Sequence, residues 1–271
     1  MIWIGCSGWS YKDWGGFIYP MGTSGNLKQY SSFFNTVEVN VTFYREVSPT
    51  TVASWIRTVS ATKNFRFSVK APMEISHRLI ITDTKRAIES MQRFSRTHLY
   101  PLQESGYAGI LLIQLPPWFS SSNLPKLLDF LNGADFGGVR VAVEFRNLEL
   151  LRSIEIRSGI QEIGFTVAEI DSPDGTFMFR DNGPGARYYR FHGRNQKSWK
   201  GFSQKPSDRY NYYYRHDELV ALAQLVRKSM ERGDEIFVYF NNHPFGNAPR
   251  NALEFSEIMG TGGSARQKQL I

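Results

Sequence analysis

Acidic, basic and amide side chains recur at the carboxyl ends of apolar, β-branched runs in this sequence. Residues two apart on a strand point to the same side, so each group shares one face of its strand. The groups are Glu38 with Asn40, Glu144 with Arg146, and Arg190 with His192 and Arg194, while Lys70, Gln114, Asn241 and Asn242 close further runs. Carboxylates and cations gathered in one pocket are typical of acid–base catalysis and of anion binding. We predict that these side chains line one mouth.

The chemistry of each side chain suggests its role. Glu144 is the candidate general base or acid, and Glu38 is a second carboxylate or an orienting group. Lys70 and Arg146 would stabilise charge, and His192 completes the candidate catalytic set. The candidate substrate-binding residues at these strand ends are Asn40, Gln114, Arg190, Arg194, Asn241 and Asn242. In the alternative interpretation, Glu38, Lys70, Glu144 and Arg146 only neutralise one another as a salt-bridge network.

Metal-ligating residue types are present without a metal motif. Of the 5 histidines, His77, His192 and His243 follow strand-like runs, and nearby carboxylates could join them. No two histidines have the short spacing of a zinc motif, so we assign no metal ligands, and a divalent metal stays a possible cofactor. The single cysteine, Cys6, cannot form an intramolecular disulfide and is expected to be a small buried hydrophobe.

The elements that must position these residues alternate regularly. Strands are expected at residues 2–8, 36–42, 65–72, 109–116, 139–146, 164–171, 186–193 and 235–242. Helical patterns lie between them, most clearly at residues 217–232, but residues 172–185 lack a helical stripe. This alternation predicts an α/β protein, a single-domain TIM-type (β/α)8 barrel. An open doubly wound sheet is the alternative, although residues 5–8 lack the glycine spacing of a dinucleotide-binding turn.

Composition limits the class of protein and its partners. The chain has 271 residues, of which 41% are hydrophobic, enough for a sizeable core. Its formal net charge of +7 favours anionic partners, either a phosphate-bearing small molecule or nucleic acid. No run approaches the length of a membrane span, so a cytoplasmic protein without a membrane partner is expected, with its oligomeric state open. We expect one domain over residues 1–260 and a flexible tail over residues 261–271.

Two loops rich in aromatic residues flank the predicted mouth, at residues 9–25 and 194–216. The second interleaves Arg194, Lys197, Lys200, Lys205, Arg209 and Arg215 with Trp199, Phe202, Tyr210, Tyr212, Tyr213 and Tyr214. Cations interleaved with aromatic rings suit stacking on bases or sugars beside phosphates. In the alternative interpretation, residues 212–214 begin the next helix and pack on the barrel.

The sequence resembles the domain of unknown function 72 family, the YecE-like proteins, from residue 4 to about residue 255. The matching stretches include residues 4–11, 36–44, 69–72, 114–117, 143–146, 190–194 and 239–242, with Ile75-Ser76-His77 close to the family's Ile-Thr-His. The resemblance implies a TIM-type barrel and adds Tyr44, His77 and Tyr239 to the candidate substrate-binding residues. A fold-level likeness of that family to endonuclease IV-type barrels implies a metal-binding cluster of His, Asp and Glu, for which this sequence is short of histidines.

Three functions follow as hypotheses. The first is an enzyme with hydrolase-type acid–base chemistry, acting on a phosphate-bearing or sugar-containing, nucleotide-like substrate. The second is a non-catalytic nucleic-acid-binding module, and the third is a metal-dependent hydrolase like endonuclease IV. Binding dominated by nucleic-acid phosphates weakens steeply with salt, whereas binding in an enclosed pocket is less sensitive, so salt dependence separates the first two.

Overall fold

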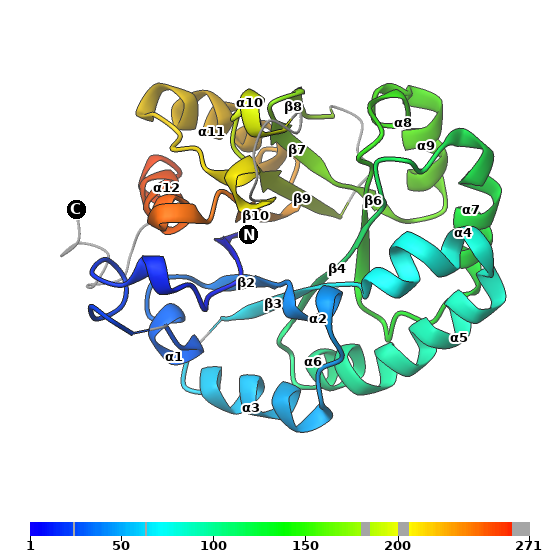
Figure 1. The fold of residues 1–271 in the computed structure, drawn as a ribbon, viewed down its shortest axis with the longest axis horizontal. Coiled ribbons are helices and arrows are strands. Elements are labelled where there is room, and N and C mark those ends of the chain that lie inside the picture. The colour runs from blue at the N-terminus through cyan, green and yellow to red at the C-terminus, as the bar shows by residue number, and fades with distance from the viewer. Residues whose placement is uncertain (24, 63, 180–184, 200–205, 262–271) are drawn as a thin grey trace. The chain divides into compact units, whose positions relative to one another are not determined.

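A computed structural model describes residues 1–23, 25–62, 64–179, 185–199 and 206–261 (Figure 1). Its residue contacts divide the chain into two compact units. The middle unit comprises Val39–Ala168, and the terminal unit comprises Met1–Glu38, Glu169–Phe179 and the described residues from 185 onward. The predicted tail lies outside the described residues from position 262.

The terminal unit contains a sheet in the order β2-β1-β10-β9-β7-β8. Its strands are β1 (Ile2–Ser7), β2 (Thr36–Val39), β7 (Glu169–Ser172), β8 (Gly175–Phe177), β9 (Ala186–Phe191) and β10 (Glu235–Phe240). Neighbouring strands pair in parallel, except that β8 pairs antiparallel with β7. The β7–β8 hairpin agrees with the absence of a helical pattern in the sequence immediately after residue 171.

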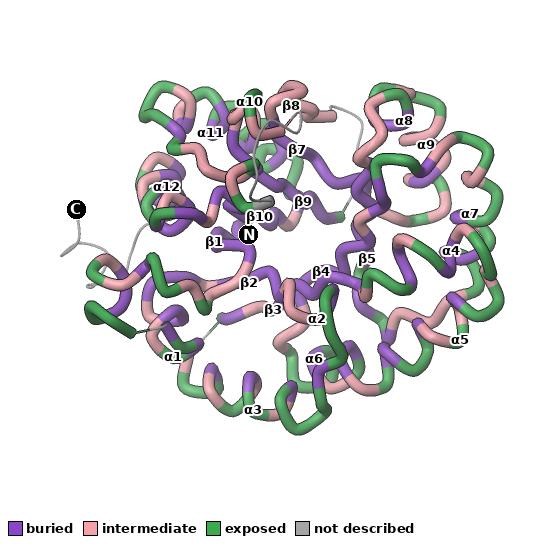
Figure 2. The backbone as a smooth tube through the Cα atoms, in the orientation of Figure 1, coloured by how far each residue is buried: buried purple, intermediate pink, exposed green. Residues whose placement is uncertain are grey.

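The middle unit contains four parallel strands in the order β6-β5-β4-β3. They are β3 (Arg66–Lys70), β4 (Ala108–Gln114), β5 (Arg140–Glu144) and β6 (Thr166–Val167). Most of their residues are buried, as the purple tube of β5 in Figure 2 shows. Burial on both faces is typical of parallel strands covered by helices and accounts for their continuous apolar runs.

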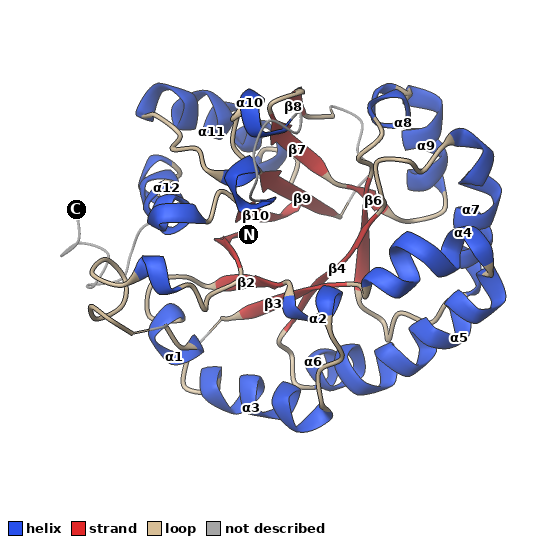
Figure 3. Cartoon of the chain, in the orientation of Figure 1, coloured by secondary structure: helices blue, strands red, loops and turns tan. Residues whose placement is uncertain are grey.

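Helices connect these strands (Figure 3). In the middle unit they are α2 (Val41–Tyr44), α3 (Pro49–Val59), η2 (Glu74–Leu79), α4 (Ile80–Thr82), α5 (Thr84–Phe94), η3 (Ser95–Leu99), α6 (Tyr100–Glu104), η4 (Ser121–Asn123), α7 (Leu124–Gly133), α8 (Leu148–Arg152) and α9 (Ile154–Glu162). In the terminal unit they are η1 (Lys12–Trp14), α1 (Leu27–Tyr30), α10 (Gln196–Trp199), η5 (Pro206–Tyr210), α11 (His216–Met230), η6 (Pro244–Gly246) and α12 (Asn247–Ile258).

Every predicted strand is present, and the alternation of parallel strands with helices is that of a TIM-type (β/α)8 barrel. The fold-class prediction is therefore confirmed. Two strands depart furthest from their predicted bounds. The second strand stops at Val39 because Asn40 is already in the right-handed helical region and begins α2. The sixth is interrupted at Ala168, between β6, which pairs with β5, and β7, which pairs with β9.

Local signals explain the helix ends. Ser48 caps α3, accepting a hydrogen bond from the Thr51 amide, and Pro49 occupies the first turn, where its missing N–H costs nothing. Helix α11 begins at His216, where the Glu218 carboxylate accepts a hydrogen bond from the Arg215 amide at 2.9 Å.

Among the described residues, no helix combines the length and apolar character needed to span a bilayer.

Candidate functional site

The strand ends of the middle unit bring together a carboxylate, an amide and a guanidinium. Glu144 lies opposite Gln114 in the pairing of β5 with β4. Arg146 extends back over both: its Nε is 2.5 Å from Glu144 Oε1, and its Nη2 donates a hydrogen bond to Gln114 Oε1 at 3.3 Å. The Glu144 carboxylate is fully buried, whereas Arg146 keeps some contact with solvent. The two residues predicted to share a strand face are therefore in contact, although β5 ends at Glu144 and Arg146 lies beyond it.

Lys70, at the end of β3, lies against an aromatic ring from α2. Its ammonium is 3.7 Å from the centroid of the Phe43 ring, a cation–π contact, and the residue is 6% exposed. The Thr42 hydroxyl donates a hydrogen bond to the Lys70 carbonyl at 2.6 Å and so fixes α2 to the end of β3. This contact explains why the chain turns into a helix immediately after β2.

His77 comes from the π-helical turn η2 and lies in the field of both cations. Its ring is 5.1 Å from the Phe43 ring, and its Nδ1 is 3.0 Å from Ser76 Oγ. Burial lowers the pKa of His77, and the charges of Lys70 and Arg146 lower it further, to about 4. At neutral pH the imidazole is therefore uncharged and able to accept a proton or donate a hydrogen bond.

Two exposed aromatic residues adjoin these groups. Trp118 follows β4 and lies edge-on to His77, 6.0 Å between ring centroids, with 68% of its surface exposed. Tyr44, which was predicted from sequence, lies edge-on to Phe43 and is 74% exposed. Sequence reasoning missed both Trp118 and Phe43. The signal for Trp118 was its place directly after the two prolines that follow β4. Exposed rings beside buried charges suit stacking on a planar or sugar ring.

In the terminal unit, Glu38 forms a buried ion pair. Arg190 donates to both carboxylate oxygens, from Nε at 2.8 Å and from Nη2 at 2.7 Å, and the Tyr188 hydroxyl adds a third hydrogen bond at 2.7 Å. Burial alone would raise the pKa of Glu38, but the Arg190 charge and these hydrogen bonds hold it below its ordinary value. Glu38 therefore orients Arg190, and the predicted anion binder Arg190 has a permanent partner.

The predicted anion binder Arg194 is also engaged. Its guanidinium contacts the buried Asp171 carboxylate, with Nη2 2.8 Å from Oδ1, and its Nη1 lies 2.9 Å from Glu218 Oε1. The Tyr214 hydroxyl donates to Asp171 Oδ2 at 2.6 Å, and the Tyr212 hydroxyl donates to Glu218 at 2.7 Å. Tyr212 and Tyr214 thus pack on the protein, although not as the start of a helix. Lys200, Phe202 and Lys205 of the same predicted loop lie outside the described residues.

His192 and Asn241 directly follow the adjacent strands β9 and β10 and meet side by side, with Asn241 Nδ2 3.0 Å from His192 Nδ1. The His192 ring is 6.1 Å from each of the Trp199 and Tyr210 rings. Three other predicted residues occupy separate positions: Asn242 donates to the Tyr212 carbonyl, Tyr239 is buried with its hydroxyl 2.6 Å from Thr36 Oγ1, and Asn40 is the N-cap residue of α2 without a side-chain capping hydrogen bond. The prediction that all these residues share one mouth involves both units and stays a prediction.

The donor sets do not fit a resident metal. Within the described parts of the chain, no group of three or more His, Cys, Asp or Glu side chains is placed to hold a metal ion. His77 faces two cations, and His192 faces an amide and aromatic rings. Neither is a typical environment for a divalent cation, so no metal-dependent step is derived. Cys6 is buried, which raises the pKa of its thiol, as expected for a small buried hydrophobe.

A TIM-type barrel with charged and amide side chains at its strand ends defines the class of protein to which this chain belongs. The chain is a member of the family described as protein of unknown function DUF72, whose model matches residues 3–270. It is 29% identical over 277 residues to the UPF0759 protein YunF of Bacillus subtilis, covering 96% of this chain and 95% of YunF.

Two crystal structures of DUF72 family proteins are similar to this chain. One, from Thermotoga maritima, superposes with a TM-score of 0.81 at 31% identity and covers 96% of this chain and 99% of its own. Another, from Enterococcus faecalis, gives a TM-score of 0.81 at 25% identity and covers 96% of each chain. The family and its fold are thus shown.

Proposed function

We propose that this protein is an enzyme acting on a small phosphate-bearing substrate with a sugar or nucleotide-like ring, bound at the carboxyl ends of β3, β4 and β5. The observation that supports this proposal is that Arg146 pairs with the buried carboxylate of Glu144, and that Arg146 and Lys70 both act electrostatically on His77. Carboxyl ends of the strands are where TIM-type barrels carry their active sites.

The binding part of the proposal rests on charge and ring contacts. Lys70 and Arg146 provide two cations against one carboxylate, so the cluster has a positive excess that favours a phosphate group. Tyr44 and Trp118 provide exposed ring faces for the sugar or base. A small substrate with both features would use both sets of contacts.

The chemical part assigns proton transfer to Glu144. The carboxylate is paired with Arg146 and buried, so it is a proton acceptor held in a fixed position, which is what a general base requires. His77, uncharged at neutral pH, is placed to donate a hydrogen bond to the substrate or to exchange a proton with it. Hydrolysis of a phosphate or glycosidic bond by an activated water is the reaction class that these groups serve best.

The first experiment measures binding of nucleoside monophosphates and sugar phosphates by isothermal titration calorimetry. Lys70→Met should weaken binding of the phosphate-bearing ligands by roughly tenfold or more, because it removes a largely desolvated cation and keeps the aliphatic stem. Lys85→Met, which removes an exposed lysine from α5, is the matched control and should bind normally. Equal affinity in the Lys70 and Lys85 variants would exclude the cationic cluster from binding.

Glu144→Gln tests catalysis separately from binding. The amide keeps the shape of the side chain but removes its charge and its capacity to accept a proton, so turnover should fall ~10²-fold or more while ligand affinity changes little. Near-normal turnover would exclude Glu144 from the chemistry, and loss of folding would support the salt-bridge interpretation. Tight binding of oligonucleotides with a steep salt dependence, without binding of small phosphates, would instead favour the nucleic-acid-binding module.

A further inference from the structure

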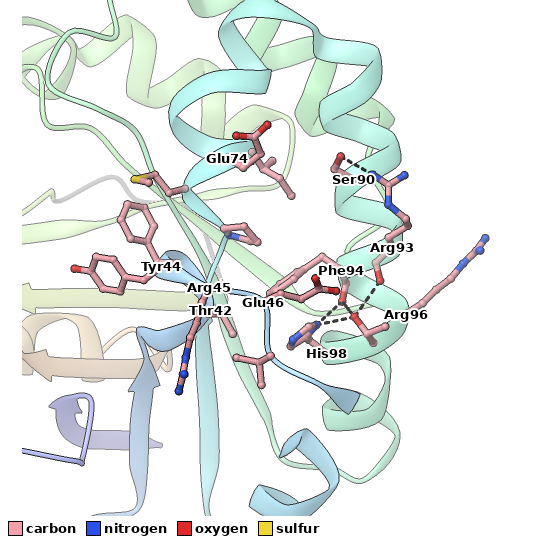
Figure 4. A pocket seen from close by; sticks show the side chains of 16 residues that line it. Thr42, Tyr44, Arg45, Glu46, Glu74, Ser90, Arg93, Phe94, Arg96 and His98 are labelled. Carbon is pink, nitrogen blue, oxygen red and sulfur yellow. Dashed lines mark hydrogen bonds between the residues drawn. The ribbon is translucent and has the colours of Figure 1, made fainter. Parts of the chain in front are cut away.

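A cavity of about 620 Å³ opens in the middle unit, away from the cluster around Glu144. Figure 4 shows it between α2 with the segment that follows it, the start of η2, and the end of α5 with η3. Small-molecule sites typically enclose ~300–1,000 Å³, so this cavity has the size of a ligand site. Phe43 and Tyr44 are common to both places: the Phe43 ring contacts Lys70, Tyr44 is a candidate substrate-binding residue, and both line the cavity. Lys70, His77, Glu144 and Arg146 do not line it.

The interior of the cavity is apolar. Val47, Ile75 and Phe94 line it, and each is buried. His98 stacks on Phe94, with ring centroids 4.3 Å apart and planes 16° from parallel, and its Nδ1 lies 2.7 Å from Thr97 Oγ1. Burial lowers the pKa of His98, so this ring too is uncharged at neutral pH. The inner walls therefore suit a hydrocarbon or aromatic body.

The rim of the cavity carries an excess of positive charge. Arg45, Arg93 and Arg96 are exposed there, together with Glu46 and Glu74. Glu74 is paired with Arg78, one helical turn further along. Arg93 donates to the Ser90 hydroxyl at 2.9 Å, while Arg45 and Arg96 form no ion pair with any described residue. Three arginines thus line the rim of an apolar cavity with one carboxylate, Glu46, that forms no ion pair with a described residue, and their side chains extend in different directions (Figure 4).

Both π-helical turns of the described chain line this cavity. Turn η2 contributes Glu74 and Ile75, and turn η3 contributes Arg96, Thr97 and His98. A π-helical turn is less favourable than an α-helical one and is frequent at functional sites. Here two such turns present residues to the same space from different helices, which is a second observation in favour of a ligand site.

We propose that this cavity is a second ligand site, for a small amphipathic anion whose apolar body occupies the interior and whose single anionic group lies among the arginines of the rim. The site adjoins the proposed substrate site, with which it shares Phe43 and Tyr44, but its cationic and apolar groups are different and it does not depend on the proposed function. Charge complementarity selects the ligand, because a neutral apolar molecule would leave the rim unused, and a cationic one would face three guanidinium groups.

The full-length protein tests this proposal with 8-anilinonaphthalene-1-sulfonate as a fluorescent probe and decanoate as its competitor. Decanoate should displace the probe, and 1-decanol should displace it less effectively. The double variant Arg45→Gln/Arg96→Gln should weaken decanoate binding by about fivefold and leave decanol binding unchanged, since each partly exposed ion pair is worth ~0.2–1 kcal/mol. Arg57→Gln/Arg86→Gln removes two exposed arginines outside the cavity and is the matched control.

A variant that removes a negative charge from the rim should change decanoate affinity in the opposite direction. Glu46→Gln removes the unpaired carboxylate of the rim and should strengthen decanoate binding by about twofold or more. Ser90→Trp, which places a bulky ring at the cavity, should reduce binding of both decanoate and decanol. Equal decanoate affinity in the two double-arginine variants, or stronger binding of decyltrimethylammonium than of decanoate, would overturn the proposal. Loss of probe binding in Lys70→Met, with none in Arg45→Gln/Arg96→Gln, would assign the probe to the substrate site and also overturn it.

Discussion

At the scale of single residues, Glu38 and Glu144 have the same chemistry but different surroundings. Three hydrogen bonds from Arg190 and Tyr188 hold the Glu38 carboxylate, whereas Glu144 pairs with Arg146, which also donates a hydrogen bond to Gln114. A carboxylate with its oxygens saturated by buried donors has less capacity to accept a proton from a substrate. We therefore regard Glu38 as a positioning residue, while Glu144, whose partner Arg146 belongs to the proposed substrate site, stays the candidate catalytic residue.

Glu38→Gln tests this distinction through stability. The variant leaves the Arg190 guanidinium, 1% exposed, without its counter-charge, and breaking a buried ion pair in this way typically costs ~3–5 kcal/mol. The free energy of unfolding, measured in urea, should fall by that amount. Asp217→Asn breaks the exposed pair with Arg215 and should change it by less than ~1 kcal/mol. A Glu38→Gln protein of normal stability without activity would return Glu38 to the catalytic set.

The sequence predicted which polar residues at a strand end point to the same side, because the two-residue periodicity of side chains follows from strand geometry alone. It could not predict the partners of those positions. Glu38 and Arg190 are 152 residues apart, and several cations were available to Glu38. Phe43 and Trp118 were missed for a related reason, because an aromatic residue near a strand end usually packs in the hydrophobic core. Their place in the candidate site is visible only from their contacts with Lys70 and His77.

At the scale of elements, Asp171 connects several segments of the terminal unit through hydrogen bonds. It lies in β7, next to the strand's last residue, and accepts hydrogen bonds from Thr176 in β8, from Arg194 after β9 and from the Tyr214 hydroxyl in the segment before α11. The Tyr214 hydroxyl also accepts a hydrogen bond from the Gly193 amide at 2.9 Å. The interrupted sixth repeat is thus held by one buried carboxylate in place of a packed helix.

Tyr214→Phe should loosen this arrangement. It leaves the Gly193 amide and one Asp171 lone pair without their partner inside the protein, a loss of ~1–3 kcal/mol in the free energy of unfolding. Hydrogen exchange at Gly193 should accelerate, and the peptides of β7 and β8 should lose protection. Tyr213→Phe, at the neighbouring position that is 48% exposed, is the control. If the two variants exchange equally, the Tyr214 hydroxyl does not hold these elements.

The sequence predicted the secondary-structure elements better than it predicted the contacts between side chains. All eight strand patterns were identified, since a buried parallel strand shows as a continuous apolar run between turn residues. Helix α2 and the π-helical turns were not identified. Helix α2 depends on the hydrogen bond from Thr42 to Lys70, 28 residues away, and π-helical turns have no distinct local pattern.

At the scale of the whole molecule, the charged groups are arranged so that acid should destabilise the fold. His77, His98 and His243 all have pKa values lowered by burial, His77 and His243 to about 4. An unfolded histidine has a pKa near ~6.5, so between these values the unfolded chain binds more protons than the folded one. Histidines with lowered pKa values stabilise the fold fully above pH ~6.5, and that stabilisation is lost as pH falls toward 4.

His243 gives the clearest case because its ring is largely enclosed, stacked on Tyr11 at 4.7 Å between ring centroids. It should contribute ~1 kcal/mol per pH unit to the slope of unfolding free energy between pH 4 and 6.5, and the half-buried His77 should contribute less because solvent screens its charge. His243→Phe keeps the stacked ring but removes the titrating group, so urea unfolding at pH 5, 6 and 7 should give a shallower slope. Tyr11→Phe alters the same contact without removing an imidazole and should keep the slope of the original protein. A His243→Phe protein with an unchanged slope would mean that protonation elsewhere governs acid unfolding.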